Sequence, residues 1–231
     1  MRGLFVTGTD TGVGKTVLSA ALLAAMVAAG EPVRAHKPVL TGLDHADADA
    51  EGQPGAWPPD HELLARVTGM RPEEVAPLRF GPAASPQLAA SLAGARIEPA
   101  RLLSAARSAA SEATLIVEGV GGLLVPLAED YSVCDLAAAL GLPVLIAARP
   151  GLGTINHTLL TLQASRAAGL AVCAVVLTPW QPEPSVLERS NLQTIARLGD
   201  VEVQTLPTLG GPDVAELARA GDTLPWRRWL A

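Results

Sequence analysis

An apolar run and a glycine-rich turn, LFVTGTDTGVGKT at residues 4–16, open this chain of 231 residues. Leu4–Thr7 has the length and apolar character of a buried strand. Residues 15–29 are rich in Ala and Leu and are followed by Gly30, which predicts a helix. A glycine turn between a strand and a helix directs backbone N–H groups and the positive end of the helix dipole toward an anion. The segment therefore predicts a phosphate-binding loop.

Lys15 and Thr16 complete a Gly-Lys-Thr triplet. In phosphate loops this triplet supplies an ammonium to the β- and γ-phosphates and a hydroxyl to Mg²⁺. The usual spacing is G-x-x-x-x-G-K-S/T, and Gly8 lies one residue too early for it. The strand, the turn, the triplet and the helix nevertheless occur in the right order. The alternative interpretation is an ordinary glycine turn before a helix.

Lysine is scarce: the chain has 17 lysines and arginines, and only Lys15 and Lys37 are lysines. Lysine is a compact point charge on a flexible stem, whereas arginine is a planar fork. We therefore expect these two positions to serve phosphoryl chemistry. Lys37 ends the second predicted strand, residues 33–37, and its alternative interpretation is an ordinary lysine at the end of a strand.

Composition excludes several classes of function. The net charge of -6 argues against a broad surface for nucleic acid or anionic membrane, and 3% aromatic residues argue against a base-stacking platform. Cys134 and Cys173 form no CxxC pair, so we expect two buried thiols in a reducing compartment. No apolar run suits a signal peptide or a membrane span, which predicts a cytoplasmic location.

Apolar strands alternate with helices along the rest of the chain. This order predicts an α/β fold with a mostly parallel sheet covered by helices on both faces, of the phosphate-loop NTPase type. We expect one domain over residues 1–231, ending in a short tail at 221–231. Further strands are expected at 114–118, 143–148, 171–178 and 201–206, and further helices at 60–67, 99–111, 156–168, 185–198 and 213–220.

Glu118 ends the apolar strand at 114–118 and precedes Gly119, Val120, Gly121 and Gly122. Ligands of open α/β sheets bind at the carboxyl ends of the strands. Phosphate-loop enzymes place an acid that is associated with Mg²⁺ at this position. The alternative is an acid that only caps the following turn.

Five ordered blocks together resemble the dethiobiotin synthetase family. They are GTDTGVGKT at 8–16, KPVLTG at 37–42, Asp60, VEGVGG at 117–122 and GTINH at 153–157. The resemblance covers roughly residues 1–210. It implies an ATP-dependent ligase of biotin biosynthesis, which converts 7,8-diaminononanoate and carbon dioxide to dethiobiotin through a carbamate and a carbamic–phosphoric anhydride.

The resemblance also assigns roles to residues. Lys15 and Lys37 would neutralise phosphate and carbamate oxygens as catalytic residues. Mg²⁺ would be held by Thr16, Asp60 and Glu118, although Asp60 alternatively serves only as the N-cap of its helix. The implied nucleotide site consists of Gly12, Val13, Gly14, Lys15, Thr16, Val17, Asp60, Glu118, Gly119, Val120, Gly121, Thr178, Pro179, Pro207, Thr208 and Leu209.

For the substrate, the resemblance implies that Thr11 and Thr41 contact the diamine end. Gly153, Thr154 and Asn156 would bind the distal carboxylate of a substrate held by the neighbouring subunit, so the active unit would be a homodimer. The segment opens a predicted helix, whose free N–H groups suit a carboxylate. The alternative is a plain connection between a strand and a helix.

The chain departs from the family at the expected base site. Thr178-Pro179 stands where many members carry the Asn that reads the adenine edge, so the sequence leaves the preferred base open.

Two other functions compete with the synthetase function: a nucleotide-switched partitioning or scaffold ATPase, and a related amidoligase. Asp10 argues against the first, since partitioning ATPases have a second lysine there. We see no glutamine-hydrolysing domain for the second.

Overall fold

A computed structural model describes residues 1–45, 56–110 and 113–231. The main sheet consists of β1 (Gly3–Gly8), β2 (Val33–His36), β5 (Thr114–Glu118), β8 (Val144–Ala148), β9 (Val172–Trp180) and β10 (Val203–Pro207). The strand order is β10-β9-β8-β1-β5-β2, and all neighbours are parallel. Parallel pairing brings the carboxyl ends of all six strands to one edge of the sheet, where ligands of such sheets bind.

The central strands are buried on both faces, which explains their continuous apolar sequences. All six residues of β1 are buried. Successive side chains point to opposite faces, so Leu4 and Val6 belong to one hydrophobic cluster and Phe5 to the other. Ile116 of β5 likewise joins the first cluster, and Leu115 the second. The sheet therefore separates two apolar cores.

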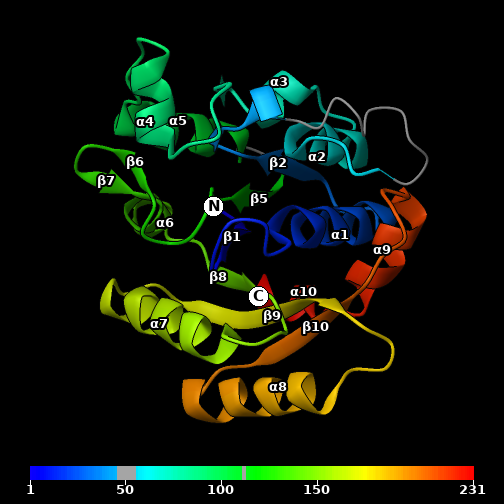
Figure 1. The fold of residues 1–231 in the computed structure, drawn as a ribbon. Helices are drawn as coiled ribbons and strands as arrows, with labels where there is room; N and C mark the ends of the chain where they lie inside the picture. Colours follow the sequence, from blue (N-terminus) through cyan, green and yellow to red (C-terminus); the bar gives the residue numbers. More distant parts are fainter. Residues whose placement is uncertain (46–55, 111–112) are drawn as a thin grey trace.

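Helices cover both faces of the sheet, as predicted (Figure 1). On the face of Leu4, the core takes side chains from α1 (Lys15–Ala28), α2 (Asp60–Thr68), α9 (Val214–Asp222) and α10 (Trp226–Trp229). On the face of Phe5, it takes them from α5 (Pro99–Ala109), α6 (Val133–Leu140), α7 (Thr154–Ala167) and α8 (Val186–Gly199). The predicted fold class is confirmed.

The longer predicted elements are present, and their ends lie within two residues of the predicted ones. Lys37 lies just outside β2, and α5 ends at Ala109, while the predicted end at residue 111 falls outside the described residues. Ser185 and Asp213 are N-caps of α8 and α9 rather than their first residues. Asp60 shows the reverse: Pro59 is the N-cap of α2, so the N-cap interpretation of Asp60 is wrong.

Several short elements were not expected. They are β3 (Val39–Leu40), η1 (Leu43–His45), α3 (Pro72–Val75), β4 (Leu78–Arg79), α4 (Pro86–Leu92), β6 (Pro126–Ala128) and β7 (Tyr131–Ser132), together with α6 and α10. Two of them, α3 and β4, lie in the proline-rich stretch at residues 70–86. The pairing of β3 with β4 joins positions almost forty residues apart, and a two-residue strand leaves no periodic signal in the sequence.

The C-terminal segment packs against the core. Gly221 and Asp222 complete α9, and a turn leads into α10. Trp226 and Trp229 are buried among side chains of the first hydrophobic cluster. The Arg227 guanidinium lies 4.1 Å from the centroid of the Trp226 ring. The segment is thus part of the packed structure.

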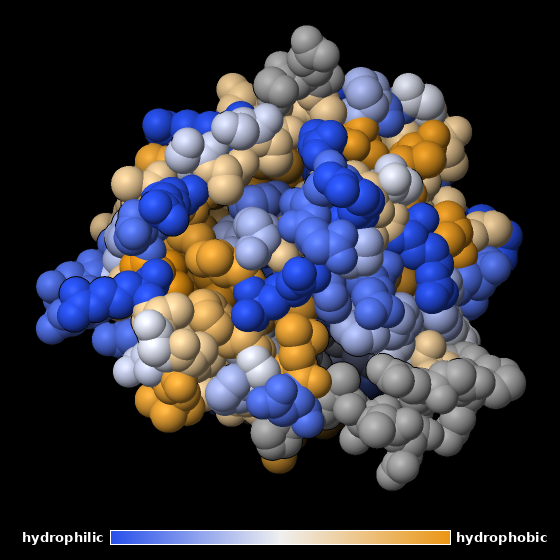
Figure 2. Space-filling model, turned by 90° about the horizontal axis from the view of Figure 1, so that it is seen from above, coloured by the Kyte–Doolittle hydropathy of each residue, from blue (hydrophilic) through white to orange (hydrophobic). Residues whose placement is uncertain are grey.

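The surface mixes polar and apolar residues, as Figure 2 shows for one face. Large exposed hydrophobic residues lie on several elements, among them Leu92, Leu152 and Val186, which is ordinary for a protein surface. Both cysteines are free thiols, with Cys134 buried and Cys173 partly buried. In the three described ranges, no helix is long and apolar enough to cross a membrane.

Candidate active site

The phosphate loop connects β1 to α1 through residues 9–14. Gly12 and Gly14 have left-handed backbone conformations, with φ of 69° and 91°, which glycine adopts without strain. A Cβ atom at Gly14 would also lie 2.7 Å from Thr178 Cγ2. Gly14 therefore has to be glycine both for its conformation and for the close packing of the loop on β9.

Lys15 is the first residue of α1, and its side chain is buried beneath the loop. Its Nζ donates a hydrogen bond to the Asp10 carbonyl oxygen at 2.9 Å. Burial lowers the pKa of Lys15 to about 8; the charge of Lys37 adds to this shift, while Glu118 and Asp60 oppose it. A buried ammonium with a lowered pKa lacks compensating negative charge, so Lys15 is suited to receive an anion.

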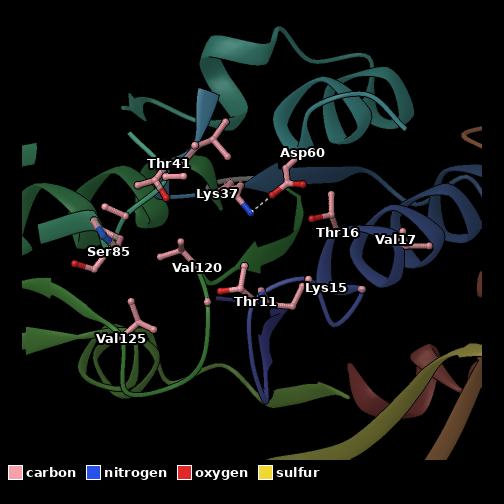
Figure 3. Close-up of a pocket in the computed structure, with 18 residues that line it drawn as sticks. Thr11, Lys15, Thr16, Val17, Lys37, Thr41, Asp60, Ser85, Val120 and Val125 are labelled. Carbon is pink, nitrogen blue, oxygen red and sulfur yellow. Dashed lines mark ion pairs between the residues drawn. The ribbon is translucent and has the colours of Figure 1, made fainter. Parts of the chain in front are cut away.

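Lys37 lies directly after β2 and is almost completely buried. Its Nζ is 2.6 Å from Asp60 Oδ2 and 2.6 Å from Glu118 Oε1. The Thr16 hydroxyl donates a hydrogen bond to the same Glu118 oxygen at 2.8 Å. Figure 3 shows Lys37 and Asp60 pointing toward each other, with Thr16 close to Asp60. Residues from α1, α2, β5 and the position after β2 thus meet at the carboxyl edge of the sheet.

The charges in this cluster stabilise one another. Burial alone would lower the pKa of Lys37, but Glu118 and Asp60 outweigh it and raise the pKa above its ordinary value. Burial likewise would raise the pKa of Asp60, but Lys37 lowers it, with help from Thr16 and Lys15. Lys37 and Asp60 are therefore both ionised at neutral pH.

The oxygens of Thr16, Asp60 and Glu118 are of the kind that Mg²⁺ prefers. Glu118 Oε2 is buried and has no hydrogen-bond partner among the described residues, so it offers a free acceptor at this point. The described residues contain no cluster of three or more His, Cys, Asp or Glu side chains that could hold a metal. Mg²⁺ keeps several waters when it binds a few protein oxygens, so the oxygens of Thr16, Asp60 and Glu118 fit it.

A cavity of about 680 Å³ opens beside this cluster. Figure 3 shows the side chains that line it, which come from the phosphate loop, the starts of α1, α2 and α4, and the segments after β2 and β5. It contains most of the predicted site near the phosphates, namely Thr11, Gly12, Gly14, Lys15, Thr16, Val17, Lys37, Thr41, Asp60, Val120 and Gly121. One cavity thus brings together four of the five sequence blocks.

Comparison with curated proteins identifies relatives of similar length. The ATP-dependent dethiobiotin synthetase BioD of Anaeromyxobacter dehalogenans (strain 2CP-1) is 46% identical over 222 residues, covering 95% of each chain. The chain belongs to the ATP-dependent dethiobiotin synthetase family. The synthetase BioD of Bacillus subtilis (strain 168) is 37% identical, covering 88% of this chain and 85% of its own. A family model described as an AAA domain matches residues 2–210.

Solved structures of lower identity share the fold of this synthetase-family chain. A ParA family ATPase from Chlorobium tepidum aligns with a TM-score of 0.56 at 16% identity, covering 96% of this chain and 97% of its own. A cobyrinic acid a,c-diamide synthase from Mycobacterium smegmatis aligns with the same score and identity, covering 99% and 95%. Both likenesses show the fold alone.

The residues expected around the base do not line the cavity. Thr178 is buried and packs its methyl group toward Gly14. Thr208 donates hydrogen bonds to the Trp180 carbonyl oxygen from its N–H at 2.9 Å and from its hydroxyl at 3.3 Å, which joins the ends of β9 and β10. The remaining predicted residues on this side are Pro179, Pro207 and Leu209, and they lie at the same two strand ends.

Three groups of predicted residues lie elsewhere. Val13, Glu118 and Gly119 are buried and do not line the cavity. The segment expected to bind a carboxylate begins α7 and does not line the cavity of its own chain: Gly153 is the N-cap, Thr154 is buried, and Asn156 is exposed.

Some lining residues had not been predicted. They are Leu40, Gly42, Ala83, Ala84, Ser85, Pro86 and Val125. Ser85 is the N-cap of α4 and accepts a hydrogen bond from the Leu88 N–H at 3.4 Å. A serine before proline is a helix-start signal that the sequence contained. The apolar members carry no such signal, because only the tertiary fold places them beside the phosphate loop.

Proposed function

We propose that this chain makes dethiobiotin from 7,8-diaminononanoate, carbon dioxide and ATP. The observation that carries the proposal is the convergence of Lys15 and Lys37 on one cavity, in a chain 46% identical to a dethiobiotin synthetase over 95% of its length. The reaction joins two amines through one carbon and needs ATP to activate the carboxyl group. Charge on phosphate and carbamate oxygens has to be neutralised while these groups are held in line.

The phosphate loop would bind the nucleotide. Backbone N–H groups of the turn and the Lys15 ammonium would neutralise the phosphates. The lowered pKa of Lys15, about 8 in the free protein, supports this role, because a bound anion would stabilise the charged form of the side chain. Nucleotide binding should therefore return the pKa of Lys15 toward its ordinary value.

Mg²⁺ would be held by the oxygens of Thr16, Asp60 and Glu118, and when bound it would neutralise phosphate charge. Lys37 Nζ lies between the two carboxylates at 2.6 Å from each. An ammonium and a divalent ion would repel each other there, so we expect Lys37 to turn away from the carboxylates. The cavity that Lys37 lines is where its charge would then meet a carbamate or a phosphoryl oxygen.

The chemical steps follow from the substrate. One amine takes up carbon dioxide to form a carbamate, and a carbamate oxygen attacks the γ-phosphate to give a carbamic–phosphoric anhydride with release of ADP. The second amine then attacks the carbamate carbon, and phosphate leaves as the cyclic urea closes. Thr11 and Thr41 line the cavity and would contact the diamine end.

The distal carboxylate would be bound by a second copy of the chain. Gly153, Thr154 and Asn156 do not line the cavity of their own chain, and the neighbouring Leu152 is 91% exposed. Gly153 and Asn156 are exposed at the start of a 14-residue helix and are therefore available to a substrate held by another subunit. The proposed active unit is therefore a homodimer.

A coupled phosphate-release assay tests the function. Phosphate should appear only when diamine, bicarbonate, Mg²⁺ and nucleotide are all present, and omission of any one should reduce the rate to that of a Lys15→Ala control purified in the same way. Equal ATP turnover without the diamine would contradict the synthetase function and favour a nucleotide switch. The same assay with ATP, CTP and GTP in parallel would establish the base preference.

A further inference from the structure

Arg149 connects the end of β8 to the phosphate loop. It is the first residue after the strand, and its side chain is exposed to solvent. One guanidinium nitrogen, NH2, donates hydrogen bonds to the carbonyl oxygens of Thr11 at 3.3 Å and of Gly12 at 3.4 Å. These two carbonyl groups belong to consecutive peptide units in the middle of the loop.

The geometry of the peptide bond gives these contacts a consequence. In a trans peptide the C=O and N–H bonds point in opposite directions. Arg149 therefore directs the N–H groups of Gly12 and Val13 away from itself. Gly12 lines the cavity, so N–H groups fixed in this way are available to phosphate oxygens. A Cβ atom at Gly12 would lie 3.1 Å from the Arg149 NH2, which makes glycine the residue that best permits the contact.

A buried amide holds the chain just after Arg149. Asn191 of α8 is 4% exposed. Its Nδ2 donates hydrogen bonds to the carbonyl oxygens of Pro150 at 2.8 Å and of Gly151 at 3.1 Å. Breaking such contacts would leave buried polar groups unpaired. A hydrogen-bonded path therefore runs from α8 through residues 149–151 to the phosphate loop.

We propose that Arg149 is a positioning residue for the nucleotide phosphates, and that Asn191 acts through it. Arg149 fixes the two peptide units of the loop, and its positive charge polarises them so that their N–H groups become stronger donors. The proposal rests on the nucleotide-binding part of the proposed function. It does not require that the diamine be the second substrate.

Titration calorimetry with ADP and Mg²⁺, without diamine, tests the proposal. Arg149→Ala should weaken ADP binding about tenfold or more, as expected for loss of a charged donor. Arg149→Lys should be intermediate, because it keeps the charge but not the planar donor group. In the full reaction, the KM for nucleotide should rise, while the KM for diamine stays within about twofold.

Arg166→Ala is the matched control. Arg166 also donates from NH2 to two carbonyl oxygens, those of Gly199 at 2.6 Å and Asp200 at 3.0 Å, but it lies on α7 away from the loop. Its loss should leave ADP affinity unchanged. Wild-type affinity in Arg149→Ala, or an equal loss in Arg166→Ala, would overturn the proposal.

Asn191→Ala tests the second part of the proposal, that Asn191 acts through Arg149. If Asn191 acts through Arg149, Asn191→Ala should weaken ADP binding, and the double variant should bind no worse than Arg149→Ala alone. Fully additive losses would show that Asn191 does not act through Arg149. Because Arg149 is exposed, its variants should fold even where Asn191→Ala does not. If phosphate release did not depend on the diamine, the proposed function would be contradicted. The comparison of ADP affinities between the wild type and the Arg149 variants would still test the role of Arg149.

Discussion

At the scale of single residues, the two lysines of the chain have opposite electrostatic environments. Both are buried near the same carboxylates, yet the pKa of Lys15 is lowered and that of Lys37 is raised. The difference follows from distance, because Lys37 Nζ touches two carboxylate oxygens while Lys15 Nζ donates to a backbone carbonyl. The sequence indicated that both lysines serve phosphoryl chemistry. It could not predict that only Lys37 is already paired with carboxylates of the protein.

Lys37→Arg should lose most activity while the protein stays folded. One nitrogen lies within 2.6 Å of two different carboxylates, and a planar guanidinium cannot occupy this buried position in the same way. We expect kcat to fall by about 100-fold or more, the size typical for loss of a group that stabilises charge in a transition state. Steady-state phosphate release measures the loss, and circular dichroism checks the fold.

Arg2→Lys is the control for this exchange. Arg2 forms a surface ion pair with Glu31 at 2.9 Å, so the substitution there should leave kcat unchanged. Wild-type rates in Lys37→Arg would remove Lys37 from the mechanism.

At the scale of secondary-structure elements, predictability depended on the length of the element and on whether it forms without a partner from a distant part of the chain. The long apolar strands and helices have a clear pattern, and the structure contains them. Helix α6 has eight residues and begins with a capping box between Ser132 and Asp135, which is a helix-start signal within the sequence itself. Strands β3 and β4 have two residues each, and they exist because the fold brings them together rather than because of local preference.

Strand β2 carries a buried histidine that should make the protein sensitive to acid. Burial, with a smaller effect of Arg34, lowers the pKa of His36 from 6.5 to about 4. Between these values the unfolded chain binds a proton that the native protein does not, so the free energy of unfolding decreases as the pH falls from about 6.5 to 4. His36 should account for a loss of about 3 kcal/mol over this range.

Urea unfolding at several pH values between 4 and 7.5 tests the predicted decrease in the free energy of unfolding at acid pH. His36→Leu should reduce the loss of stability on the acid side, because leucine does not titrate. His157 is an exposed histidine of α7. His157→Leu should show the same loss of stability at acid pH as the wild type. The same acid dependence in His36→Leu and in the wild type would contradict the prediction.

At the scale of the whole molecule, the C-terminal segment completes the core on the α1 face. Trp226 is 1% exposed and is among the largest fully buried side chains. Trp226→Ala should lower the free energy of unfolding by about 3–5 kcal/mol through the cavity that it creates. Trp57→Ala, at a tryptophan that is 39% exposed, should change it by less than about 1 kcal/mol. Urea denaturation measures both, and equal effects would contradict the assignment of Trp226 to the core.

The sequence by itself determined the parallel α/β fold and the phosphate loop, and it marked the lysines and acids that meet at the carboxyl edge of the sheet. Strand and helix patterns are local, and the turn chemistry of a phosphate loop lies within nine residues, so both can be read along the chain. Only the tertiary structure decided how these groups interact. It placed Lys37 between Asp60 and Glu118, brought Arg149 to the loop carbonyls, and left the start of α7 outside the cavity of its own chain. These contacts join residues from 23 to 138 positions apart, and at that range packing rather than local sequence sets the distances.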